Sequence, residues 1–224
     1  MEQETNARIF EELKKDILER AKLNGSCIIE YRSAANANNL TTLMRVVKRN
    51  FVWCCQRDII TGSMINKYQD MFNDSEIFYN QDVKYGYLLL DEGEKTACGN
   101  TYVFATNKST INADCHAMII ADKSAHVIAH NDTFVTMLDT STGRFYGRAR
   151  VEVFGNTEIE LNDSSTAYVY SNPKSIAGHD YSVIYIQDIG GLPAINCKLS
   201  DNAIVINTKL QTRHYINETI NLKK

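Results

Sequence analysis

The 224-residue chain has no excess of basic residues, no long apolar run and no charged-then-apolar pattern in its first residues. Its formal net charge of −3 disfavours nucleic acid as a partner, because nucleic-acid-binding domains normally carry a basic excess. No stretch is apolar enough to cross a membrane, and the charged residues Glu2, Glu4, Arg8, Glu11 and Glu12 stand where a secretory signal would be basic and then apolar. We therefore expect a cytoplasmic protein with no membrane partner.

The sequence also lacks the spacing of a metal site. Its six cysteines show no CxxC pattern and lie near no paired histidines, so we expect no metal and no cofactor. The adjacent Cys54 and Cys55 are interpreted as two buried thiols on a helix rather than as a redox pair. With 44% hydrophobic residues and only two prolines, the chain can hold one main domain and a small accessory domain.

What the chain does contain is an eight-residue repeat, strict over residues 101–171. In each unit the second, fourth and sixth residues are small or apolar, and the eighth is usually Asn, Asp, Gly or Ser. Three alternating inward positions followed by a turn residue describe one short strand and one corner, so the repeat predicts a β-solenoid. None of the inward positions is charged, which has a chance probability on the order of one in a thousand. The units read NTYVFATN, KSTINADC, HAMIIADK, SAHVIAHN, DTFVTMLD, TSTGRFYG, RARVEVFG, NTEIELND and SSTAYVYS.

The outward positions predict how many units form one coil. Large apolar residues are concentrated in alternate units, which indicates two units, about 16 residues, per coil of a flattened two-sheet solenoid. We call one outer surface the apolar face, defined by Tyr102, Phe104, Met118, Ile120, Phe134, Leu138, Phe154, Tyr168 and Tyr170. We call the other the polar face, defined by Asp114, His126, His130, Arg144, Glu158 and Glu160.

The two faces suggest different roles. The apolar face is too large and continuous to be left in water on an ordinary monomer, so we expect the N-terminal region or a second chain to cover it. The polar face is expected to be solvated, with Asp114 beside His130 and Arg144 beside Glu160 as cross-strand pairs. We predict that a protein partner binds there.

The interior is expected to broaden along the chain, and the repeat then loses its register. The sixth position is alanine in the first four units and larger afterwards, with Gly143 beside Phe145 compensating for the large ring. After residue 171, Pro173 and an extra residue within 178–180 are expected to form a corner bulge, after which Ser182 resumes the pattern.

Three regions are predicted. Residues 1–75 form a helical head, with apolar stripes that contain Leu13, Leu43 and Phe72 and with N-caps at Asn39 and Thr61. Such short helices need a surface to cover, so we expect the head to lie over the apolar face or the thin end of the solenoid. The solenoid spans 76–188, with 76–100 as an irregular first coil, and a terminal strand pair within 189–224 caps the wide end.

No catalytic residues are predicted. The period is eight rather than the six of hexapeptide acyltransferases, no calcium-binding GGxGxD unit is present, and no ranks of outward threonine form an ice-binding face. His126, His130 and Asp114 are close enough for acid–base or metal chemistry, but a polar strand of this kind is more often a solvated surface.

The repeats ADKSAHVIAHND and GRARVEVFGNTEIELNDSSTAYVY follow a head that contains NF at 50–51 and WCC at 53–55. Together they resemble the octad-repeat β-solenoid proteins of gut Bacteroidetes and of their phages and mobile elements. That resemblance implies the fold and a cytoplasmic, often phage-linked setting, without an assigned activity. The departures at Gly143, at Phe145 and after Pro173 suggest a specialised surface.

Three functions remain open from the sequence. The first is a non-enzymatic binding protein, in a phage or mobile-element setting one that occludes a host defence protein. The second is self-assembly, as a homodimer through the apolar face or as a filament. The third is an enzyme that acts on a glycan or nucleotide at the polar face.

Overall fold

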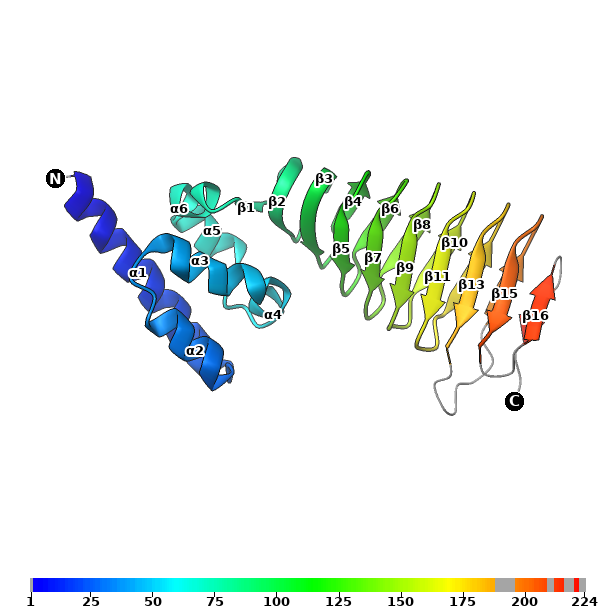
Figure 1. Ribbon diagram of the computed structural model, residues 1–224, viewed down its shortest axis with the longest axis horizontal. Coiled ribbons are helices and arrows are strands. Elements are labelled where there is room, and N and C mark those ends of the chain that lie inside the picture. Colours follow the sequence, from blue (N-terminus) through cyan, green and yellow to red (C-terminus); the bar gives the residue numbers. More distant parts are fainter. Residues whose placement is uncertain (1, 188–195, 209–211, 216–219, 222–224) are drawn as a thin grey trace. The chain divides into compact units, whose positions relative to one another are not determined.

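The computed structural model describes residues 2–187, 196–208, 212–215 and 220–221. It contains two compact units, residues 1–79 and 80–224, drawn in blue to cyan and in green to red in Figure 1. The boundary lies just beyond the predicted residue 75. The first unit, the head, contains α1 (Glu2–Leu23), α2 (Ile28–Ala35), α3 (Leu40–Arg49), α4 (Phe51–Gln56), α5 (Gly62–Lys67), α6 (Gln69–Asp74) and β1 (Ile77–Tyr79).

The helices of the head follow the apolar stripes of the sequence. Leu13 of α1, Leu43 of α3 and Phe72 of α6 are completely buried, and α2 packs against both α1 and α3. The two predicted N-caps are confirmed, because Asn39 Oδ1 accepts a hydrogen bond from Thr42 N (2.9 Å) and Thr61 Oγ1 accepts one from Met64 N (3.3 Å). The head therefore has a core of its own. The expected docking of the head on the solenoid stays a prediction.

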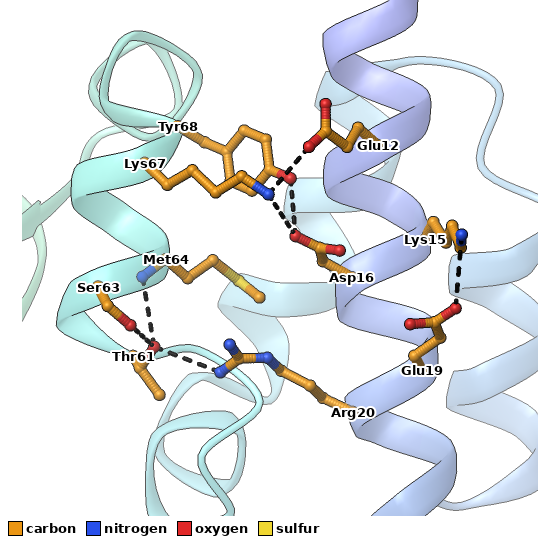
Figure 2. A network of polar contacts seen from close by, with 10 residues as sticks. All are labelled: Glu12, Lys15, Asp16, Glu19, Arg20, Thr61, Ser63, Met64, Lys67 and Tyr68. Carbon is orange, nitrogen blue, oxygen red and sulfur yellow. Dashed lines mark hydrogen bonds and ion pairs between the residues drawn. The ribbon is translucent and has the colours of Figure 1, made fainter.

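Polar contacts fasten α1 to the segment formed by α5 and α6 (Figure 2). Lys67 Nζ contacts Glu12 Oε1 at 2.9 Å and Asp16 Oδ2 at 3.1 Å, and Tyr68 Oη donates to Asp16 Oδ2 at 2.7 Å. The hydrogen bond from Tyr68 and the contacts from Lys67 hold the pKa of Asp16 below its usual value. One turn further along α1, Arg20 donates to Thr61 Oγ1 at 3.3 Å. These contacts fix the direction of α1 within the head.

The second unit is the predicted β-solenoid, with about six turns of about 16 residues. Thr110 pairs with His126 and Phe134 with Arg150, so each strand lies parallel to the strand one full coil away. Two sheets result, and β5, β7, β9, β11, β13 and β15 follow one another along one of them in Figure 1. They are β5 (Met118–Ala121), β7 (Phe134–Met137), β9 (Arg150–Val153), β11 (Thr166–Val169), β13 (Val183–Ile186) and β15 (Ile204–Asn207). The opposite sheet contains β4 (Thr110–Ala113), β6 (His126–Ala129), β8 (Thr142–Phe145), β10 (Glu158–Leu161), β12 (Ser175–Gly178) and β14 (Asn196–Leu199).

The start and the end of the solenoid differ from the prediction. The region 76–100 is not irregular, because β2 (Val83–Leu90) pairs in parallel with the long strand β3 (Glu94–Ala105). The first part of β3 pairs with β4 and the last part with β5, so this strand turns the corner without a break. The coils also continue past residue 188 through β14 and β15. At the end of the described chain, β16 (Thr212–Tyr215) and β17 (Ile220–Asn221) pair antiparallel with β15 and β14.

In seven of the nine units the eighth residue turns the corner in the left-handed backbone region. Asn107, Asn131, Asp139 and Asp163 have φ between 51° and 57° there, and Gly147 has φ 65°. Asn, Asp and Gly accept this conformation at low cost, which explains the composition of the eighth position. Two corners hold less suitable residues: Cys115 has φ 62° and Lys123 has φ 54°.

Replacing Cys115 with a residue that tolerates the left-handed region should therefore stabilise the solenoid. Cys115→Asn is expected to raise the free energy of unfolding of the solenoid by about 1 kcal/mol, because asparagine tolerates the left-handed region that costs other residues about 1–2 kcal/mol. Cys115→Ala keeps that cost and serves as the control at the same site. Urea denaturation followed by circular dichroism would measure both. Equal stability of the two variants would contradict the explanation from backbone conformation.

The inward positions form the core of the solenoid. Val127, Val151 and Leu161 are completely buried, as is Phe145, whose ring lies beside Gly143. A Cβ atom at Gly143 would approach Phe145 Cζ to 2.8 Å, so the predicted compensation between these two residues is confirmed.

The register slip lies earlier than predicted. Pro173 is buried at the second position of its unit, and the next inward residue is Ile176 rather than residue 175. Glu158 then pairs with Ser175, so the extra residue falls between Pro173 and Ile176 and not within 178–180. The proline ring fills the inward position, and the chain therefore gains its extra residue only after it.

Candidate binding surfaces of the solenoid

The polar face is a set of side-chain rows in which neighbouring coils contact each other. On β6 and β8, a hydrogen bond of 2.7 Å joins His126 Nδ1 and Thr142 Oγ1. On β8 and β10, Arg144 Nε lies 3.3 Å from Glu160 Oε2, which confirms the predicted pair. Glu158 on β10 accepts a hydrogen bond from Lys174, which follows the corner of the next coil. We call the strand that one coil contributes to a sheet a rung. The row pattern thus places opposite charges on neighbouring rungs of the same sheet.

The other predicted pair has a different partner. Asp114 and His130 lie on neighbouring rungs, but Asp114 Oδ1 accepts hydrogen bonds from Asn131 Nδ2 (2.5 Å) and from Cys115 N (2.6 Å). These two bonds hold the pKa of Asp114 below its usual value. The ring of His130 stacks on Tyr146 instead, with 5.0 Å between centroids. The sequence could not show this, because the corner residue Asn131 comes within reach only when the coils stack.

Each of the two histidines contacts a side chain on the next coil, His126 that of Thr142 and His130 that of Tyr146. Burial, followed by the nearby Arg144 charge, lowers the pKa of His126, so its ring is neutral near pH 7 and holds Thr142. Within the described part of the chain, no group of three or more His, Cys, Asp or Glu side chains could hold a metal ion. The polar face presents charges and hydrogen-bonding groups in fixed rows.

The apolar face is less continuous than predicted. Between the aromatic residues of its two ends, strand β9 turns Arg150 and Glu152 outward, while Val151 and Val153 are buried in the core. The neighbouring strand β7 adds Thr136 at the same level as Glu152. Two charges therefore interrupt the apolar face on the rung of β9, where Phe154 follows directly after the strand, a feature that a count of aromatic residues overlooks.

Its aromatic rings cover one another. Phe154 stacks on Tyr170 with 4.8 Å between ring centroids, and Tyr168 stacks on Tyr185 at 5.1 Å. Because parallel coils bring equivalent residues face to face, each ring hides much of its neighbour, and most residues of the apolar face are half-buried. Phe104 is only 2% exposed, whereas Met118 and Phe154 are 46% and 47% exposed. Much of the apolar surface is therefore already covered by stacking.

The head contains a cavity that the sequence did not suggest. It measures about 400 Å³ and is lined by parts of α1 to α4, including Ile17, Tyr31, Val47, Trp53 and Cys54. On its polar side, the carboxylate of Glu30 accepts hydrogen bonds from Arg49 (2.6 Å) and Asn50 (3.2 Å).

Cys54 lies at the wall of this cavity. Burial raises its pKa to about 12, and burial also raises that of the adjacent Cys55. Both thiols are buried on α4, as predicted, and stay protonated near neutral pH. No spacing in the sequence reveals the cavity itself, because its walls come from four separate helices.

Comparison of the chain with protein-family models, with curated proteins and with solved structures finds no match in any of the three. The part of the chain described by the structure contains no helix long and apolar enough to cross a membrane. Function is therefore inferred from the geometry of these surfaces.

Proposed function

We propose that the protein is a non-enzymatic binding protein that presents the polar face of its solenoid to a protein partner. The observation that supports this most is the ordering of the rows. His126 is held by Thr142, Arg144 by Glu160, and Glu158 by Lys174. Side chains already fixed in the free protein lose little conformational entropy when a partner binds.

The charges of this face also provide specificity. The Arg144 and Glu160 side chains are 57% and 41% exposed, so a partner can reach both members of the pair. Glu158 lies on the same strand as Glu160, two residues away, and adds a second carboxylate. A partner with basic groups opposite these carboxylates and an acidic group opposite Arg144 would be selected against partners of other charge patterns.

The identity of the partner belongs to the same proposal. The resemblance to repeat proteins of phages and mobile elements suggests a host protein, for which occlusion by a flat rigid surface would be sufficient. No residue of the chain identifies that host protein. The partner must therefore be found by experiment.

Affinity capture followed by mass spectrometry tests the proposal. The wild type is compared with a variant that carries Arg144→Ala, Glu158→Ala and Glu160→Ala, and with a control variant that carries Met118→Ala and Phe134→Ala on the opposite sheet. We expect the wild type and the control variant to capture one stoichiometric protein. The triple variant is expected to capture at least tenfold less of that protein. Retention of that protein by the triple variant, or its absence from all three, would count against binding through the polar face.

A further inference from the structure

We infer that the apolar face pairs with the apolar face of a second copy of this chain, with the two-fold axis parallel to the long axis of the solenoid. This inference concerns the sheet opposite the polar face and goes beyond the proposed function. It starts from the two charged residues of β9, Arg150 and Glu152, which lie in the middle of an otherwise apolar surface.

The surroundings of these two charges are the reason for the inference. Arg150 pairs in the sheet with Phe134 and Thr166, and Glu152 pairs with Thr136 and Tyr168. Neither charge forms an ion pair or hydrogen bond with the rest of the described chain. On the polar face, by contrast, the comparable charges are paired across rungs.

A second copy supplies the missing partners. In a symmetric dimer the same surface meets itself, so the pattern of charges must be complementary to its own image. Rotation about an axis parallel to the solenoid, between the rows of Arg150 and Glu152, places Arg150 opposite the Glu152 of the second copy and Glu152 opposite its Arg150. Rotation about an axis parallel to the strands would instead place like charges opposite each other, which costs free energy. The charges therefore select the first axis.

The same rotation brings the two rungs that precede β9, those of β5 and β7, toward their images in the second copy. Met118 lies in the row of Arg150, and Ile120 lies in the row of Glu152, so Met118 meets Ile120 of the second copy. Phe134 meets Thr136 in the same way on the next rung. The half-exposed Met118 is thus buried, and Phe134 and Tyr168 of the two neighbouring rungs lie beside the ion pairs, where surrounding water is reduced. Since only part of each side chain remains exposed before pairing, we expect a dissociation constant in the micromolar range.

Analytical ultracentrifugation of charge variants tests the pairing. The full-length wild type is expected to dimerise at about 100 μM, whereas Arg150→Glu and Glu152→Arg are each expected to stay monomeric because both opposed contacts become repulsive. The double variant Arg150→Glu with Glu152→Arg restores both ion pairs and is expected to dimerise again. An equimolar mixture of the two single variants should form a heterodimer.

The controls separate loss of pairing from loss of folding. Arg144→Glu changes a charge on the polar face and is expected to leave the dimer unchanged, and circular dichroism checks that every variant is folded. Rescue of dimerisation by the double variant cannot arise from misfolded single variants. A wild type that stays monomeric at 100 μM, or a dimer that survives both single charge reversals, would overturn the inference.

Discussion

Unfolding of a Phe145→Ala variant is expected to require about 3–5 kcal/mol less than unfolding of the wild type. Phe145 is completely buried in the narrow space between the two sheets, where every neighbouring coil is fixed by backbone pairing. The coils cannot close the resulting cavity without breaking their register, so relaxation is limited. Urea denaturation followed by far-ultraviolet circular dichroism measures the difference.

Phe154→Ala is the matched control for this change. Phe154 lies just after β9, in the same solenoid, but its side chain is 47% exposed and stacks on Tyr170. Its removal is expected to cost about 1 kcal/mol, the worth of an exposed aromatic pair. Similar losses for the two variants would mean that the solenoid interior is not closely packed at Phe145.

Gly155→Ala is expected to destabilise the solenoid by about 3 kcal/mol or more. A Cβ atom at Gly155 would lie 2.3 Å from both the N and the O atoms of Asp139, on the coil below. Because these are backbone atoms, the contact is relieved only if two corners move apart, and overpacking of this kind costs about 1–3 kcal/mol or more. Denaturation by urea and the thermal midpoint both report the loss.

Gly93→Ala provides the comparison for Gly155. The backbone of Gly93 has φ 74°, but nothing lies within 4 Å of an added Cβ atom there. Only the cost of the left-handed conformation applies, about 1 kcal/mol. If Gly155→Ala were no more harmful than Gly93→Ala, the stacking of corners would have to be looser than the contact distances indicate.

The solenoid was predictable because its core repeats locally. Small and apolar side chains at the inward positions, such as Ala113, Val127 and Leu161, determine where each strand faces, and the corner residues determine where it ends. The spacing between equivalent residues then follows without knowledge of distant contacts. The pair of Arg144 and Glu160 could be read in the same way, because it depends only on the coil length.

Other features depend on contacts that a repeat does not encode. Strand β3 turns its corner without a break because both its ends pair with neighbouring coils, which the irregular residues before position 101 did not suggest. Asp114 binds Asn131 rather than His130, since the corner amide comes closer than the ring. The charged rung of β9 was readable in the sequence at Arg150 and Glu152, but aromatic residues dominated the interpretation of that face.

The two edges of the solenoid differ in how they can change during evolution. On the edge where the chain passes from β10 to β11 and from β12 to β13, the corners keep one conformation, with positive φ at Asp163 and Asp180. The extra residue of the coil that contains Pro173 lies on the opposite edge, after β11, where Glu158 pairs with Ser175. Duplication or deletion of a whole coil would preserve every inward position, whereas the one-residue insertion after Pro173 is accommodated on that second edge. The number of coils and the length of an individual coil can therefore change independently of each other in this protein.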